Sequence, residues 1–266
     1  MLAIGCGGAV AATIGFIDDF FGIRAVKKLL AQGCLALWSF ILFYENVYAT
    51  DFDTFSGVFQ VALILLCLFV SVWFINMYNF IDGVDGMAVG GAIYVCIAAI
   101  VVLTINGADQ NLSYVFALLA ASSLGFLPFN LPPASVFMGD AGSIFLGYCL
   151  GSLLLATALQ GQISVWTWIA ILGYFIGDTT TTGVYRLFFV KRWYGVHRSH
   201  AYQNLARILN NHARVTYGTA IYHALWAMPL AIWSAVDPGK GPLAASLSLG
   251  PAVLWTVRFG PRLSSD

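Results

Sequence analysis

Residues 58–75 read VFQVALILLCLFVSVWFI, a run of eighteen positions without a charged side chain. A helix that crosses a bilayer needs about 20 mostly apolar residues. A transmembrane barrel shows short segments of alternating hydrophobicity instead. A continuous apolar run favours a helix, because a helix satisfies its own backbone hydrogen bonds in lipid. This stretch therefore predicts a transmembrane helix.

Similar apolar runs, separated by short polar segments, occur along the whole chain. We expect nine spanning helices, near residues 2–17, 29–44, 58–75, 87–105, 112–129, 144–159, 163–185, 215–234 and 243–257. The predicted fold class is an all-α, polytopic transmembrane helical bundle. We expect residues 1–266 to form a single integral-membrane domain.

The composition excludes two other classes of protein. The chain is 60% hydrophobic and 9% charged, whereas soluble domains carry about 25% charged residues. A disordered chain has few apolar residues, and a nucleic-acid-binding protein has a basic surface. The 12 Lys and Arg are balanced by 12 Asp and Glu, so we expect no nucleic-acid partner.

The basic residues predict the orientation, because Lys and Arg near span ends accumulate on the cytoplasmic side. In this threading one side holds Arg24, Lys27, Lys28, Arg186, Lys191, Arg192, Arg198, Arg207, Arg214, Arg258 and Arg262. Lys240 alone falls on the other side. We therefore expect a cytoplasmic C-terminus and a cytoplasmic loop over residues 186–214.

Nine spans place the N-terminus outside, yet Met1 opens directly into an apolar run without a basic flank. A cleaved signal peptide needs a positive n-region and a small-residue cleavage site, which this start lacks. We expect upstream helices to be missing from the sequence.

Six aspartates gather at the predicted cytoplasmic ends of the spans. They are Asp18, Asp19, Asp82, Asp85, Asp140 and Asp178. Ionisable residues at a membrane are costly and are functional candidates by default. The alternative is a scatter of solvated helix ends.

Residues 15–22, GFIDDFFG, place two adjacent carboxylates where a helix leaves the membrane. Such a pair can hold Mg²⁺ near a phosphate or supply a base toward an acceptor phosphate. The alternative is an interfacial cap or turn.

Residues 79–86, NFIDGVDG, carry Asn79, Asp82 and Asp85 at spacings of three, which on a helix lie near one face. Gly83 and Gly86 allow a tight turn or a close approach of a ligand. The segment lacks the full spacing and the terminal Glu of an EF-hand. Cap aspartates and packing glycines are the alternative.

Residues 137–143, FMGDAGS, precede the span near residue 144. A helix start favours phosphate, and Asp140 there can add a metal ion. Phe137 offers a stacking face for a base, although a plain helix start with a lipid-facing Phe is the alternative.

Residues 197–203, HRSHAYQ, lie in the longest polar stretch. Arg198 can bind phosphate oxygens in a forked geometry, and His197 or His200 can donate hydrogen bonds or titrate near neutrality. A basic loop that sets topology or meets anionic lipid is the alternative. We interpret His212 and His223 as structural.

These four segments, in this order, resemble the polyprenyl-phosphate N-acetylhexosamine-1-phosphate transferases of glycosyltransferase family 4. The resemblance runs from about Gly15 to Gln203, and HRSHAYQ is similar to the branch that starts lipopolysaccharide O-antigen or similar surface glycans. It implies a multi-pass protein of the bacterial inner (plasma) membrane with a cytoplasmic active site. Family members have about eleven helices, of which about two precede the first one here. Because those helices supply substrate contacts and part of the lipid groove, we expect little activity from the 266 residues alone.

The resemblance implies roles only at matching positions. Catalytic roles fall to Asp18, Asp19, Asp82, Asp85 and His200, substrate contacts to Asn79, Phe137, His197 and Arg198, and metal ligation to Asp140 and Asp19. Asp18 is the candidate for activating the lipid phosphate, and Phe137 for stacking on uracil. The division of roles between His197 and His200 stays open.

The implied reaction moves N-acetylhexosamine-1-phosphate from a UDP-N-acetylhexosamine to undecaprenyl phosphate, releases UMP and requires Mg²⁺ (or Mn²⁺). The implied partners are both substrates and membrane lipid. The alternatives are an inactive truncated paralogue or membrane scaffold, and an ion-coupled transporter. The sequence leaves open the sugar, the oligomeric state and the choice between one-step and two-step transfer.

Overall fold

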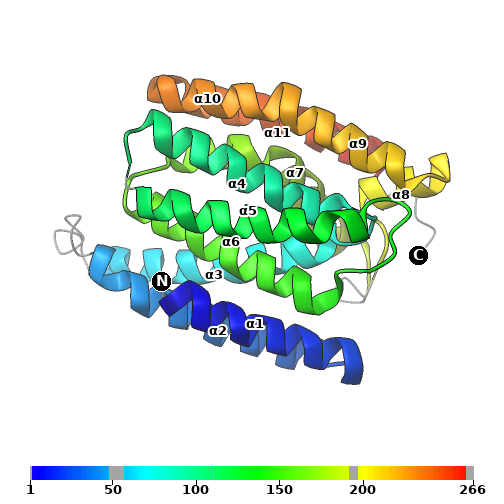
Figure 1. Ribbon diagram of the computed structural model, residues 1–266, viewed down its shortest axis with the longest axis horizontal. Helices are drawn as coiled ribbons and strands as arrows, with labels where there is room; N and C mark the ends of the chain where they lie inside the picture. The colour runs from blue at the N-terminus through cyan, green and yellow to red at the C-terminus, as the bar shows by residue number, and fades with distance from the viewer. Residues whose placement is uncertain (1, 48–56, 109, 192–196, 262–266) are drawn as a thin grey trace. The chain divides into compact units, whose positions relative to one another are not determined.

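The computed structural model describes residues 2–47, 57–108, 110–191 and 197–261 (Figure 1). Throughout these residues the regular structure is helical and contains no strand, which confirms the predicted all-α class. The elements are α1 (Leu2–Phe21), α2 (Ala25–Val47), α3 (Gly57–Ile81), α4 (Met87–Ile105), α5 (Gln110–Asn130), α6 (Gly139–Leu159), α7 (Val165–Phe189), α8 (Ala201–Leu209), α9 (His212–Tyr222), the π-helical turn η2 (His223–Ala227), α10 (Met228–Val236), the 3-10 turn η3 (Pro238–Lys240) and α11 (Gly241–Phe259).

Each of the nine expected spans coincides with a helical segment, the eighth being the continuous run α9–η2–α10. Seven segments of the described chain are long and apolar enough to cross a membrane: Ile4–Phe21, Ala25–Phe43, Gly57–Ile81, Met87–Ile105, Gln110–Asn130, Gly139–Leu159 and His212–Val236. The two other expected spans, α7 and α11, are helices of 25 and 19 residues that do not reach the same mean hydropathy.

Two expectations about local structure are wrong. Helix α3 ends at Ile81, so Asp82 and Asp85 lie in a turn and do not share a helical face with Asn79. Gly86 ends that turn at φ 74, a left-handed conformation that glycine adopts readily. The expected loop over residues 186–214 is also partly helical, because it contains α8.

The chain forms two compact units. Unit 1 comprises residues 1–79 and 138–162, and therefore contains α1, α2, most of α3, and α6. Within it α1 packs along α6 and against α2. Glycines allow α1 and α6 to pack closely, since a Cβ at Gly7 would lie 1.9 Å from the Tyr148 hydroxyl. A Cβ at Gly147 would lie 2.9 Å from the Cα of Ile75, which shows that the backbones of α6 and α3 also approach closely.

Polar side chains join the helices inside unit 1. The Ser39 hydroxyl donates to the Tyr148 hydroxyl over 2.6 Å and lies 3.1 Å from that of Ser152. The Asn76 amide donates to the side-chain oxygen of Gln32 over 2.7 Å. Interhelical hydrogen bonds of this kind hold helices together where the surroundings are apolar. They fix α2 relative to α3 and α6.

Unit 2 comprises residues 80–137 and 163–266. Helices α4 and α5 lie side by side in it, as do α7 and α11, and α10 contacts α4, α7 and α11 (Figure 1). A Cβ at Gly173 would lie 2.8 Å from the carbonyl carbon of Ser248, so the backbones of α7 and α11 approach each other closely. The Ser248 hydroxyl donates to the Ala170 carbonyl over 2.7 Å across that interface.

Candidate functional site

In unit 1 two carboxylates from different helices share one ammonium group. The Nζ of Lys28, in the first turn of α2, lies 2.7 Å from Oδ2 of Asp18 at the end of α1. The same Nζ hydrogen-bonds to Oδ2 of Asp140 in the first turn of α6. The side chains of Asp18, Lys28 and Asp140 are 12%, 16% and 29% exposed. A partly buried cluster with one cation and two anions therefore lies at this end of unit 1.

Further hydrogen bonds hold both carboxylates in place. Oδ1 of Asp18 accepts from the backbone N–H of Ile23 over 2.5 Å. Oδ1 of Asp140 accepts from the Asn79 amide over 2.7 Å, and that amide also donates to the Ser143 hydroxyl over 3.0 Å. The positions of Asp18 and Asp140 are thus set by α1, α3 and α6 together.

Asp19 has a different arrangement from its neighbour Asp18. Its two oxygens accept from the backbone N–H groups of Asp140 and Ala141 over 2.9 and 3.0 Å. The first N–H groups of a helix lack partners within the helix, and a carboxylate there also interacts favourably with the helix dipole. Gly139, at φ 64, starts this helix where a Cβ would lie 2.8 Å from Asp19. Asp19 therefore caps α6, and metal ligation by it stays a prediction.

The donor set of the cluster fits Mg²⁺ only in combination with substrate. In the described residues no three His, Cys, Asp or Glu side chains are close enough together to hold a metal ion. Mg²⁺, however, usually takes one or two carboxylates and completes its octahedron with phosphate oxygens and water. Asp18 and Asp140 already approach one shared cation. This pair fits a Mg²⁺ ion whose remaining ligands are phosphate oxygens and water.

From the sequence, Lys28 was expected only to set the orientation, whereas the structure places it in this cluster. Asp18 and Lys28 stand at equal separations from Ile23, in the turn that joins α1 to α2. In a helical hairpin, residues at equal separations from the turn lie next to each other. This symmetry is the signal that identifies Lys28 from sequence.

In unit 2 the turn after α3 is held through Asp85. Oδ2 of Asp85 accepts from the Ala134 N–H over 3.1 Å, and Oδ1 lies 3.2 Å from Nδ1 of His212 at the start of α9. The Asp85 carbonyl accepts from the Thr216 hydroxyl over 2.6 Å. His212, interpreted from sequence as structural, thus contacts one of the predicted catalytic aspartates.

The loop that leads to Phe137 is attached to the same turn. The Asn130 side-chain oxygen accepts from the Gly86 N–H over 3.0 Å, and its amide donates to the Val136 carbonyl over 2.9 Å. Phe137 itself is 75% exposed on unit 2. Its ring is therefore accessible, and its stacking on a base stays a prediction.

The HRSHAYQ segment folds onto residues 80–83 of unit 2. The Tyr202 hydroxyl donates to the Phe80 carbonyl. The Phe80 ring centroid lies 5.9 Å from that of His197 and 5.6 Å from that of His200. A Cβ at Gly83 would lie 2.4 Å from the Gln203 amide nitrogen. The structure therefore brings the second and fourth motifs into contact.

The two histidines of this segment differ in exposure. His200 is 2% exposed, and its Nδ1 lies 3.4 Å from Oδ2 of Asp178, whose Oδ1 accepts from the Ala201 N–H over 2.9 Å. His197 is partly exposed and Arg198 is exposed. His197 and Arg198 are thus the accessible pair, whereas His200 is packed beside a buried carboxylate at the start of α8.

Burial raises the pKa of the Tyr202 hydroxyl well above its ordinary value, and the nearby carboxylates of Asp178 and Asp82 raise that pKa further. The hydroxyl therefore stays protonated and donates to the Phe80 carbonyl over the whole physiological pH range. This hydrogen bond therefore joins the HRSHAYQ segment to residues 80–83 at any pH used in an assay.

We expect Tyr202→Phe to destabilise the protein by about 0.5–1.5 kcal/mol, because it removes the hydrogen bond from the Tyr202 hydroxyl to the Phe80 carbonyl. Tyr202 is fully buried. Tyr114→Phe is the matched control, since Tyr114 is 65% exposed and bonds only weakly to Gln110 over 3.4 Å. Thermal unfolding followed by circular dichroism measures both changes, and equal melting temperatures for the two variants would contradict the assignment.

The sequence model of glycosyl transferase family 4 matches residues 1–158. The chain belongs to glycosyl transferase family 4. The matched range contains Asp18, Asn79, Asp82, Asp85 and Asp140.

Individual relatives extend the similarity beyond that range. The chain is 28% identical over 292 residues to the decaprenyl-phosphate N-acetylglucosaminephosphotransferase of Mycolicibacterium smegmatis, which covers 98% of this chain and 71% of the relative. It is 32% identical to the probable undecaprenyl-phosphate N-acetylglucosaminyl 1-phosphate transferase of Bacillus subtilis, over 70% of this chain and 53% of the relative. It is 36% identical to the phospho-N-acetylmuramoyl-pentapeptide-transferase of Staphylococcus saprophyticus, over 50% of this chain and 46% of the relative.

This family 4 protein spans about half the length of the B. subtilis and S. saprophyticus relatives. Its alignment with the M. smegmatis protein includes 98% of this chain and 71% of that relative. The candidate membrane spans and the relatives together make it a multi-pass membrane protein.

Proposed function

We propose that the chain transfers N-acetylhexosamine-1-phosphate from a UDP-N-acetylhexosamine to undecaprenyl phosphate and releases UMP. The names of the relatives support a polyprenyl phosphate as acceptor and an amino-sugar phosphate as the transferred group. In this proposal an oxygen of the lipid phosphate forms a bond to the β-phosphorus of the nucleotide sugar. The bond from that phosphorus to the UMP oxygen breaks.

The observation that carries the proposal is the cluster of Asp18, Lys28 and Asp140 in unit 1. Phosphoryl transfer is catalysed mainly by positioning and by neutralising charge on phosphate oxygens. Lys28 supplies a fixed positive charge, held between two carboxylates whose own positions are fixed by hydrogen bonds. Two carboxylates and one ammonium leave a net negative charge, so the cluster would suit a diphosphate when a divalent cation is bound with it.

Mg²⁺ held by Asp140 and Asp18 would offset the charge of the diphosphate when it is bound. Asp18 presents one oxygen toward Lys28 while the Ile23 N–H holds the other. This geometry keeps the Asp18 carboxylate oriented to receive a proton or to position an acceptor phosphate. Asp19, by capping α6, orients the turn that carries Asp140.

The finer parts of the proposal concern the nucleotide sugar and the location. We assign the diphosphate and sugar side to His197 and Arg198 because they are accessible, and the uracil to the exposed ring of Phe137. The bias of basic residues supports a cytoplasmic active site in a bacterial inner membrane. The product would start a lipid-linked surface glycan of the O-antigen type.

The test uses membranes of cells that express the protein from its complete gene. They are supplied with undecaprenyl phosphate and, separately, with UDP-N-acetylglucosamine and other UDP-N-acetylhexosamines. We expect UMP and a lipid-linked sugar diphosphate to form in equal amounts from at least one donor. Formation of neither product from any donor would refute the proposal.

Removal of divalent metal is expected to abolish UMP release, because two carboxylates and the diphosphate would then lack a shared divalent cation. Excess EDTA should stop the reaction, and Mg²⁺ or Mn²⁺ in excess of the chelator should restore it. Ca²⁺ serves as the control, since it prefers more ligands at longer distances than Mg²⁺ does. Activity that persists in EDTA after extensive dialysis would contradict the metal requirement.

A further inference from the structure

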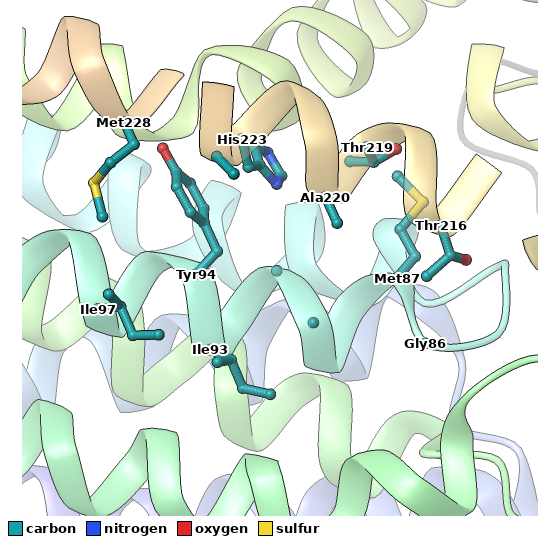
Figure 2. Close-up of a pocket in the computed structure, with 13 residues that line it drawn as sticks. Gly86, Met87, Ile93, Tyr94, Ile97, Thr216, Thr219, Ala220, His223 and Met228 are labelled. Atoms are coloured by element: carbon teal, nitrogen blue, oxygen red, sulfur yellow. The ribbon is translucent and has the colours of Figure 1, made fainter. Parts of the chain in front are cut away.

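A cavity of about 440 Å³ lies in unit 2 between α4 and the continuous segment α9–η2–α10 (Figure 2). Its volume falls in the range of about 300–1,000 Å³ that is typical of ligand pockets. The residues that line it belong almost entirely to two of the candidate membrane spans, Met87–Ile105 and His212–Val236. A ligand of this cavity therefore comes most directly from the lipid phase.

Most of the cavity wall is apolar. Met87, Ile93, Ile97 and Met228 provide the larger side chains. None of the thirteen lining residues, all within the described part of the chain, carries a charge. An ionised head group in the cavity would lose its hydration without gaining a partner, which is strongly unfavourable. The cavity therefore suits a neutral molecule.

Two buried polar atoms, in residues that line the cavity, lack partners. The Tyr94 hydroxyl and Nε2 of His223 are buried and make no hydrogen bond within the residues that the structure describes. His223 is 3% exposed, and its ring stacks on that of Tyr94 with centroids 4.2 Å apart and planes 4° apart. Figure 2 shows the two rings next to each other on the cavity wall. Buried polar groups without a partner are rare and need an explanation.

The backbone at His223 is also unusual. Residues His223–Ala227 form a π-helical turn, in which the N–H of Met228 bonds to the His223 carbonyl. Pro229 follows, and it has no N–H to offer to the preceding turn. Single π-helical turns occur frequently at functional sites. This turn sets the position from which His223 faces α4.

We propose that the cavity binds a neutral glycerolipid, whose hydroxyl or ester carbonyl hydrogen-bonds to Tyr94 and His223. The Tyr94 hydroxyl can donate and accept, and Nε2 of His223 donates or accepts according to its tautomer, which matches a hydroxyl or an ester. From Met87 to Ile97 the lining follows α4 for roughly 15 Å at 1.5 Å per residue, long enough to hold much of an acyl chain. Neither Tyr94 nor His223 has a part in the proposed transfer reaction.

The test fills the cavity without disturbing the fold. A Cβ at Gly90, which lines the cavity, meets nothing within 4 Å, so Gly90→Leu places its side chain in that space. Gly125→Leu is the matched control, because Gly125 lies on α5, meets nothing within 4 Å and is not part of the lining. The probe is 1-monooleoylglycerol with a photoreactive diazirine in its acyl chain, and mass spectrometry maps the labelled peptides.

We expect labelling of α4 and η2 in the natural protein and in Gly125→Leu, and its loss in Gly90→Leu. Tyr94→Phe keeps the cavity volume and is expected to weaken binding roughly fivefold, the loss of one hydrogen bond. Labelling that is unchanged in both Gly90→Leu and Tyr94→Phe would overturn the proposal. Displacement of the probe by undecaprenyl phosphate as readily as by unlabelled monooleoylglycerol would also overturn it, because the cavity would then hold the acceptor's chain.

Discussion

Asp140→Asn is expected to lower UMP release by a factor of about 10²–10³, the range found when one preorganised electrostatic group is removed from an active site. The substitution keeps the size of the side chain and one oxygen that can accept from Asn79. It removes the negative charge that shares Lys28 with Asp18. The loss should appear in kcat for every UDP-sugar that the protein accepts.

The same variant should keep its thermal stability, which separates a catalytic role from a structural one. Asp18 and Lys28 still form an ion pair in Asp140→Asn, and one of two neighbouring like charges has gone. Asp237→Asn is the matched control, since the Asp237 side chain accepts from the Gly239 N–H in a surface turn, and asparagine can do the same. Equal rates of UMP release in Asp140→Asn and Asp237→Asn would remove the unit 1 cluster from the proposed mechanism.

Most of the spanning helices were predictable because they are long apolar runs, whereas the short amphipathic helix α8 was not. Every expected span coincides with a helical segment, including the run α9–η2–α10 that is interrupted by a π-helical turn. Helix ends were less predictable, because the residues that end a span in lipid do not end the helix. Asp18 and Asp19 lie inside α1, which continues to Phe21.

The candidate site was predictable as a set of motifs and not as a set of contacts. Asp18, Asn79 and Asp140 were selected because carboxylates and amides at span ends are hard to explain otherwise. Their arrangement depends on contacts between residues 61 and 112 positions apart, such as Asn79 with Asp140 and Lys28 with Asp140. No local pattern encodes such pairs. The different uses of the neighbours Asp18 and Asp19 likewise follow from which helix each one faces.

The packing of α1 on α6 at Gly15 leaves no room for a larger residue. The Cβ of Gly15→Ala would lie 2.2 Å from the Asp140 carbonyl oxygen and 2.5 Å from the Cα of Ala141. Both are backbone atoms, so no side-chain rotation relieves the overlap. We expect a loss of about 1–3 kcal/mol in the free energy of unfolding, the usual cost of overpacking.

Activity should fall together with stability in Gly15→Ala, because α1 must move away from the first turn of α6. That movement separates Asp18 and Asp19 from Asp140, whose contacts span these two helices. Gly5→Ala is the control in the same helix, where a Cβ meets nothing within 4 Å. Alanine there should stabilise the helix by about 0.5–1 kcal/mol relative to glycine. Thermal unfolding of the two variants should therefore shift in opposite directions, and shifts of the same sign would show that α1 does not pack on α6 at Gly15.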